Sequence, residues 1–203
     1  MAIRSKLVVV AFYQPKTDDT EPFFNRFVAN VDRPYCHVEL AFPVNSAGTT
    51  QEGLYDEHME SCCIFWGERA ELVKKRFSRR NYRLLYVPVT PKQWSDMRAR
   101  AAEIVAANAQ FSRYSMLSTL VRVLPVLREA RDPDATCCSI MTAQLLVHGG
   151  VLPGTVNPRR VTPSGLQKLL LEHTQMSSLC FGVSALQLKN LRCTSVGPTA
   201  VRS

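Results

Sequence analysis

Several features that would point directly to a function are missing from this 203-residue sequence. No apolar run reaches the roughly 18 residues that a membrane-spanning helix needs. Neither GxxxxGK[ST] nor GxGxxG occurs, so a nucleotide-binding fold has no support. There is no internal repeat and no low-complexity segment. What remains is an ordinary globular composition, 46% hydrophobic and 21% charged, in a chain long enough for one core and too short for two domains to be assigned.

Regular cysteine spacing is also missing. The seven cysteines are odd in number, and four of them form the adjacent pairs Cys62-Cys63 and Cys137-Cys138, which rarely bridge each other. Residues 7–13 are apolar, rich in β-branched side chains and not followed by a small-residue cleavage site, so we interpret them as a buried strand and not as an export signal. We therefore expect free thiols in a reducing, cytoplasmic compartment.

No metal or cofactor is expected. Strand pairing could gather Cys36, His37, Cys62 and Cys63 around a zinc ion, but their spacing is not CxxC and adjacent cysteines seldom ligate one zinc comfortably.

The net charge of +8 has two interpretations. Much of the charge lies between Lys74 and Arg83, and more in Arg159-Arg160. A solvated basic surface is one interpretation, and attraction to nucleic acid or to an anionic membrane surface is the other. No aromatic interleaving or nucleic-acid-binding motif accompanies the charge.

Hydrophobic periodicity predicts an α+β domain. Strands are expected at residues 6–13, 36–42, 61–66, 71–77 and 82–89, mostly antiparallel because short turns join them, with a further strand within 49–60 left open. Helices are expected at 23–30, at 91–108 after the capping sequence TPKQ, at 138–148 before Gly149-Gly150, and at 165–173. Residues 177–183 are predicted as a last strand. We expect one domain over 1–187 and a flexible tail over 188–203.

A candidate nucleophile stands at the predicted helix start at residue 138. The unpaired amides and the positive end of the helix dipole favour a thiolate there, and the same amides can stabilise an oxyanion. Cys138 is the first choice and Cys137 the alternative. Two buried cysteines that merely pack a helix start would give the same pattern.

A candidate base stands on the second predicted strand. A neutral imidazole at His37 could take the proton of the thiol. Glu39 lies two residues further along and therefore on the same face of the strand, where its carboxylate could orient the imidazole. Gln51 and Glu52, across the following turn, are competing third members.

Three ordered segments resemble the circularly permuted papain-like hydrolases of the NlpC-type superfamily, which include lecithin:retinol acyltransferase-like enzymes and poxviral and bacterial relatives. The segments are YCHVELAF (35–42), CSIMTAQLL (138–146) and VTPSGL (161–166). The resemblance covers roughly residues 6–175. The family's frequent Cys-Ser-Glu is replaced here by Cys138-Ser139-Ile140.

The resemblance implies an antiparallel sheet packed against the helix that carries the nucleophile. It selects Cys138 over Cys137, because Cys138 is the cysteine followed by serine, and it makes His37 the base. In parts of the family the third polar residue lies on the following strand, which would favour Gln51 or Glu52 over Glu39.

The expected activity is thiol hydrolysis or acyl transfer at an amide, ester or thioester, with a peptide or an acyl lipid as substrate. The chain also resembles versions from large DNA viruses, which implies a host cell or a virion as its location. The rival interpretations are a non-catalytic binding or virulence protein on the same fold and a basic nucleic-acid-binding protein. The sequence does not indicate an oligomeric state.

Overall fold

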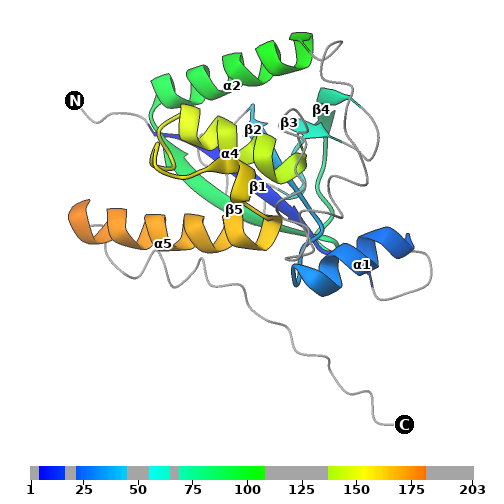
Figure 1. The fold of residues 1–203 in the computed structure, drawn as a ribbon. Coiled ribbons are helices and arrows are strands. Elements are labelled where there is room, and N and C mark those ends of the chain that lie inside the picture. The colour runs from blue at the N-terminus through cyan, green and yellow to red at the C-terminus, as the bar shows by residue number, and fades with distance from the viewer. Residues whose placement is uncertain (1–4, 17–21, 45–54, 65–68, 108–136, 182–203) are drawn as a thin grey trace.

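The computed structural model describes residues 5–16, 22–44, 55–64, 69–107 and 137–181. In these ranges the chain forms a five-stranded antiparallel sheet and four α-helices, with a short 3₁₀ turn at Pro158–Arg160 (Figure 1). The α+β class expected from the sequence is therefore confirmed. None of the helices in these ranges has the combined length and hydropathy that crossing a bilayer requires.

The first four strands of the sheet form an antiparallel meander, and the fifth strand returns to pair with the first. Its strands are β1 (Lys6–Tyr13), β2 (His37–Pro43), β3 (Met59–Ile64), β4 (Ala70–Lys75) and β5 (Tyr82–Val89). The spatial order is β4-β3-β2-β1-β5, and every neighbouring pair is antiparallel. Strands β1, β2 and β3 are therefore interior strands, and β4 and β5 form the two edges of the sheet.

Alternation along the strands separates two apolar layers. On β1, Val8 and Val10 belong to the main core beneath the helices, whereas Val9 and Ala11 belong to a second cluster on the opposite face. On β2, Leu40 joins the main core in the same way. The continuous apolar run of β1 is thus explained by burial of both faces.

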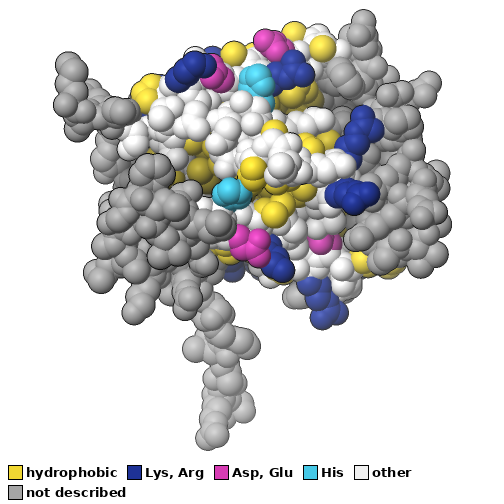
Figure 2. Space-filling view, turned by 60° about the vertical axis from the view of Figure 1, so that its left-hand side comes forward, with side chains coloured by type: hydrophobic (Ala, Val, Ile, Leu, Met, Phe, Trp, Pro, Cys, Tyr) yellow, Lys and Arg dark blue, Asp and Glu magenta, His cyan; other side chains and the backbone are white. Residues whose placement is uncertain are grey.

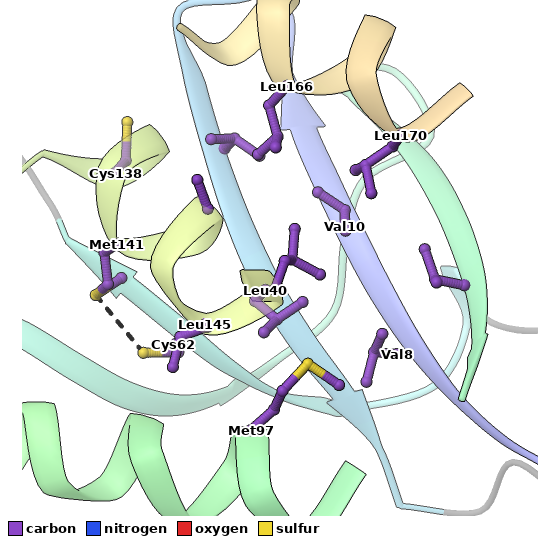
Figure 3. Close-up of a cluster of buried hydrophobic side chains, with 14 of the residues drawn as sticks. Val8, Val10, Leu40, Cys62, Met97, Cys138, Met141, Leu145, Leu166 and Leu170 are labelled. Atoms are coloured by element: carbon purple, nitrogen blue, oxygen red, sulfur yellow. Dashed lines mark hydrogen bonds between the residues drawn. The ribbon is translucent and has the colours of Figure 1, made fainter. Parts of the chain in front are cut away.

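Three helices lie on one side of the sheet: α2 (Pro91–Ala106), α4 (Cys138–His148) and α5 (Pro163–Phe181). Helix α4 packs on the interior strand β2 and contacts α2 and α5 on either side. Figure 3 shows its turns against β2, with Cys138 on the first turn and Met141 and Leu145 on the following ones. Because α4 is buried on nearly all sides, its first turn is held firmly against the sheet.

The start of α2 follows its sequence signal. The Thr90 hydroxyl accepts from the Gln93 backbone N–H at 3.2 Å, and the Gln93 side chain accepts from the Thr90 N–H at 3.0 Å. This is the reciprocal capping box that the sequence predicts.

The remaining helix, α1 (Phe23–Val31), precedes β2. Its Val28 packs with Cys36 and Phe27 in a small separate cluster. Asp32, which ends the helix, accepts a hydrogen bond from Thr162 Oγ1 at 2.7 Å and another from the Ser164 N–H at 2.9 Å. The chain that enters β2 is thereby tied to the start of α5.

One predicted element is wrong in the described range. Residues 177–181 belong to α5 and not to a strand. Between Leu166 and Phe181 there is neither proline nor glycine to end a helix, and the five residues 177–181 contain no β-branched side chain, so the α5 pattern continues.

Several other predictions lie outside the described residues. They concern the competing residues Gln51 and Glu52 and the tail at 188–203.

Candidate active site

His37 is the first residue of β2, where β2 is paired on one side only. It pairs with Tyr13 of β1, whereas the pairing of β2 with β3 begins at Leu40. The first residues of β2 therefore extend beyond their pairing with β3. The His37 side chain retains 12% of its exposure, so the imidazole is largely buried but still touches the surface.

Cys138 is the first residue of α4 and is 5% exposed. Figure 3 shows it on the first turn, beyond the packed layer of Met141 and Leu145. The residue before it, Cys137, is the N-cap in an extended conformation and makes no side-chain capping bond. The positive end of the helix dipole is thus directed at the Cys138 side chain without competition from a capping carboxylate.

The structure brings these two residues together as hydrogen-bonded partners. Burial by itself would raise the pKa of the Cys138 thiol. The charge and hydrogen bond of His37, together with the backbone N–H groups of Val38 and Ser139, outweigh burial and lower it. Val38 can serve in this way because it lies in the part of β2 that is not paired with β3.

The imidazole responds in the opposite direction. Burial opposes its charge, but the Cys138 thiolate and then the Glu39 carboxylate outweigh burial and raise the pKa of His37 to about 10. Both shifts favour the ion pair of thiolate and imidazolium at neutral pH. Such a pair is a nucleophile already deprotonated, with its proton stored on the neighbouring base.

Glu39 is completely buried and lies beside the ring as its position two residues along the strand predicts. Its Oε1 accepts from His37 Nε2 at 3.2 Å. This bond fixes the ring orientation and leaves Nδ1 as the nitrogen that faces the thiol. Burial alone would raise the pKa of Glu39, but the interactions with His37 and then with Lys75 outweigh burial and lower this pKa to about 2.

Three residues that sequence reasoning missed complete the surroundings of this carboxylate. Ser61 Oγ donates to Glu39 Oε2 at 2.7 Å, Lys75 Nζ lies 2.5 Å from the same oxygen, and Tyr82 Oη donates to Oε1 at 3.0 Å. Burial and the Glu39 charge raise the pKa of Tyr82, so its hydroxyl remains a donor. No short motif marks these residues, because three different strands supply them.

The alternative nucleophile, Cys137, has a different environment. It is 7% exposed, and its sulfur lies 3.4 Å from the Ser139 hydroxyl. The dihedral angles of the N-cap, φ −143° and ψ 172°, direct its side chain differently from that of the first helical residue.

The three segments that carry the family resemblance meet around this site. Ser139 Oγ, next to Cys138, donates to the Val161 carbonyl at 2.7 Å. Gln167 Nε2 on α5 donates to Tyr35 Oη at 2.9 Å, two residues before His37. Segments distant in the sequence are therefore connected through direct hydrogen bonds.

The cysteines considered for zinc are not gathered at one point. Cys62 lies in the main core with its sulfur 3.8 Å from Met141 Sδ, whereas Cys36 packs with Val28 in the separate cluster behind α1. In the part of the chain that the structure describes, no group of three or more His, Cys, Asp or Glu side chains could hold a metal ion. Cys36, Cys62, Cys63, Cys137 and Cys138 are all buried, and none of these five forms a disulfide.

Basic side chains are dispersed over the face shown in Figure 2, where lysine and arginine are separated by neutral surface. Some are paired: Arg98 binds Glu60 with Nε–Oε2 at 2.6 Å, and Lys92 binds Asp96 at 2.6 Å. Attraction to nucleic acid or to an anionic membrane surface stays a prediction.

Comparison with known proteins finds no match: no family model, no curated protein and no solved structure is detectably similar to this chain. The resemblance to permuted papain-like hydrolases therefore rests on the three sequence motifs alone.

Proposed function

We propose that the protein is a thiol hydrolase or acyltransferase of permuted papain-like type, with Cys138 as nucleophile, His37 as base and Glu39 as the group that orients His37. The observation that carries the proposal is the buried contact of the Cys138 thiol with the His37 imidazole at the start of α4. A cysteine at the start of a helix with only a packing role would need neither a contacting imidazole nor a buried carboxylate behind that imidazole.

In the proposed reaction the Cys138 thiolate attacks the carbonyl carbon of an amide, ester or thioester. The carbonyl π electrons move to oxygen, and the backbone N–H of Cys138 in the first turn of α4 stabilises the oxyanion. The intermediate collapses, the bond to the leaving group breaks, and His37 gives the leaving group its proton. The product of this half-reaction is an acyl thioester on Cys138.

Deacylation reverses these roles. Water, or another hydroxyl or amine acceptor, gives a proton to His37 as it attacks the thioester carbonyl, and the thiolate leaves. Glu39 stays ionised throughout and stabilises the imidazolium. A water acceptor makes the protein a hydrolase and an alcohol or amine acceptor makes it a transferase, with a peptide or an acyl lipid as the proposed donor.

Thiol alkylation across pH tests the ion pair. Iodoacetamide is reacted with the wild type and with Cys138→Ala, Cys137→Ala and His37→Ala between pH 5 and 9, and the labelled peptide is identified by mass spectrometry. We expect rapid labelling of Cys138 below pH 7 in the wild type and in Cys137→Ala. In His37→Ala the pH at which the Cys138 alkylation rate is half-maximal should move toward ~8.5, the pKa of an ordinary thiol. A midpoint near that value in the wild type would overturn the proposal.

Covalent chemistry is tested separately with activated acyl esters. Short-chain and long-chain p-nitrophenyl esters and a peptide thioester should each be assayed for a mass increase on Cys138 that hydroxylamine removes. Cys138→Ala should show no such adduct, whereas Cys137→Ala should retain it. A non-catalytic binding protein on this fold would show a reactive thiolate with no acyl adduct from any of these donors.

A further inference from the structure

The residue behind Glu39 is placed unusually for a surface lysine. Lys75 ends β4, an edge strand that β3 separates from β2. Its side chain nevertheless spans β3 and brings Nζ to 2.5 Å from Glu39 Oε2. The Lys75 side chain is 23% exposed, and its ammonium lies 5.3 Å from the centre of the Phe77 ring. Holding a long side chain in one conformation costs rotamer entropy, so the interaction with the carboxylate has to be favourable.

Charge balance explains what this interaction does. In the ion-pair state of the proposed site, Cys138 and Glu39 are anions and His37 is the one cation between them. Those three groups carry a net charge of −1 in an environment where Glu39 is completely buried and Cys138 is 5% exposed. Lys75 brings the sum to zero. Buried charge is tolerated when it is paired and hydrogen-bonded, and is costly when it is not.

We propose that Lys75 is a positioning residue that holds Glu39 ionised and thereby keeps the Cys138–His37 pair charged. The inference rests on the function proposed above and adds a fourth member to its site. The resulting row of alternating charges begins at the helix start and ends on the edge strand. Lys75 touches neither Cys138 nor the reacting carbonyl, and acts through Glu39.

Other groups near the carboxylate do not replace this cation. The titratable side chains that interact with Glu39 come from four elements besides β4: His37 of β2, Cys62 of β3, Tyr82 of β5 and, through His37, Cys138 of α4. Of these, only His37 can be positively charged, and it is already shared with Cys138. Ser61 and Tyr82 donate neutral hydrogen bonds, which do not change the sum of charges.

The sign of the effect follows directly. Removing the ammonium leaves the buried site with excess negative charge, so that protonation of Glu39 and of Cys138 becomes easier. A protonated Glu39 also supports the imidazolium less, which weakens the thiolate further. Since a cation within 4–6 Å of a carboxylate shifts its titration by about 1–3 pH units, we expect a secondary upward shift of about one unit in the pH profile of Cys138 alkylation, which slows alkylation by up to about tenfold on the acid side of the profile.

The experiment is the pH profile of Cys138 alkylation in Lys75→Met, Lys75→Arg and Lys74→Met. Lys75→Met keeps the apolar stem and removes the charge, and its profile should move upward by about one unit. Lys75→Arg retains a cation and should restore most of the wild-type profile. Lys74 is the exposed neighbour on the same strand, so Lys74→Met controls for the loss of one basic charge and should leave the profile unchanged.

A double-variant cycle separates a positioning role from a merely structural one. In a Glu39→Gln background, adding Lys75→Met should cause no further shift, because Lys75 acts only through the carboxylate. An equal shift in both backgrounds, or a Lys75→Met profile identical to that of the wild type, would overturn the inference. A wild-type profile typical of an ordinary thiol would instead overturn the proposed function, so the two failures are distinguishable.

Folding of each variant is verified by circular dichroism and a urea titration before labelling. If Lys75→Met does not fold, Lys75→Gln takes its place, and the pH profiles of Lys75→Gln and Lys75→Arg are compared in the wild-type and Glu39→Gln backgrounds. A profile of Lys75→Gln that lies above that of Lys75→Arg in the wild-type background only supports the inference, and equal profiles of the two variants contradict it.

Discussion

The Ser139 hydroxyl donates a 2.7 Å hydrogen bond to the Val161 carbonyl, which joins the residue after the candidate nucleophile to the segment leading into α5. Both residues are buried, with Ser139 only 3% exposed. The bond connects the start of α4 with the segment before α5, and burial keeps water from replacing either partner. It therefore holds the first turn of α4 in place against its neighbour.

Replacing Ser139 with alanine should cost about 1–3 kcal/mol of unfolding free energy, because the Val161 carbonyl loses its buried partner. A urea titration measures the change. Ser78 also takes part in a hydrogen bond, but in an exposed turn, so Ser78→Ala is the matched control and should change stability by less than about 0.5 kcal/mol. Equal effects of the two substitutions would show that the Ser139 bond does not secure α4.

Glu39 should make stability depend on acid in a defined window. Its pKa is about 2 in the folded protein against an ordinary 4.5, so the folded state binds the proton less readily than the unfolded chain. The carboxylate therefore stabilises the fold fully above pH 4.5, by about 3 kcal/mol at most. This contribution is lost progressively as the pH falls from 4.5 toward 2.

The measurement compares urea unfolding of the wild type and Glu39→Gln from pH 6 to pH 2.5. The difference in unfolding free energy should be largest at pH 6 and should shrink as the pH falls. Glu71→Gln, a change at an exposed carboxylate on β4, controls for removal of a negative charge. If the difference in unfolding free energy between the wild type and Glu39→Gln stays constant with pH, the charge of the carboxylate does not contribute to stability.

The local part of this architecture could be predicted from the sequence. The capping sequence at Thr90, the glycines after His148 and the β-branched apolar run at residues 7–13 each depend on a few neighbouring residues, and the structure has α2, α4 and β1 at those places. The strand prediction is wrong over 177–181 because a short apolar run has no clear period, and only the absence of a helix-ending residue distinguishes the continuing helix.

The candidate site divides in the same way. Glu39 beside His37 follows from the strand period of two, which is local. Lys75 and Ser61 reach the same carboxylate only because β4, β3 and β2 are adjacent and their register is set. Strand order and register depend on contacts between distant segments, so no pattern of spacing in one segment could have named these residues.

Asp32 should stabilise the entry to β2 through its bonds to α5. Its carboxylate accepts from Thr162 Oγ1 at 2.7 Å and from the Ser164 N–H at 2.9 Å, which satisfies donors at a helix start. Asp32→Ala should therefore cost about 1–3 kcal/mol of unfolding free energy. Asp56 is 79% exposed and pairs with Arg79 at 3.4 Å, so Asp56→Ala serves as the control.

The Asp56 control should stay within about 0.5 kcal/mol of the wild type. Hydrogen exchange at the amides of 164–166 adds a local readout, since these amides should exchange faster in Asp32→Ala than in Asp56→Ala. If global stability and local exchange respond alike in the two variants, the connection between α1 and α5 contributes nothing beyond a surface charge.

The contact between α2 and α4 makes the sharpest packing prediction. A Cβ on Gly149 would lie 2.4 Å from Met97 Cγ and 2.6 Å from its Sδ, and Met97 is completely buried, so the side chain has no solvent to move into. Gly149→Ala should therefore destabilise the fold by about 1–3 kcal/mol. Gly154→Ala meets nothing within 4 Å and should be neutral or stabilising by up to about 1 kcal/mol. Adding Met97→Ala to Gly149→Ala should lower the unfolding free energy by less than Met97→Ala does alone, because the new methyl group fills part of the vacated space. Strictly additive changes in unfolding free energy would show that the two side chains do not compete for the same volume.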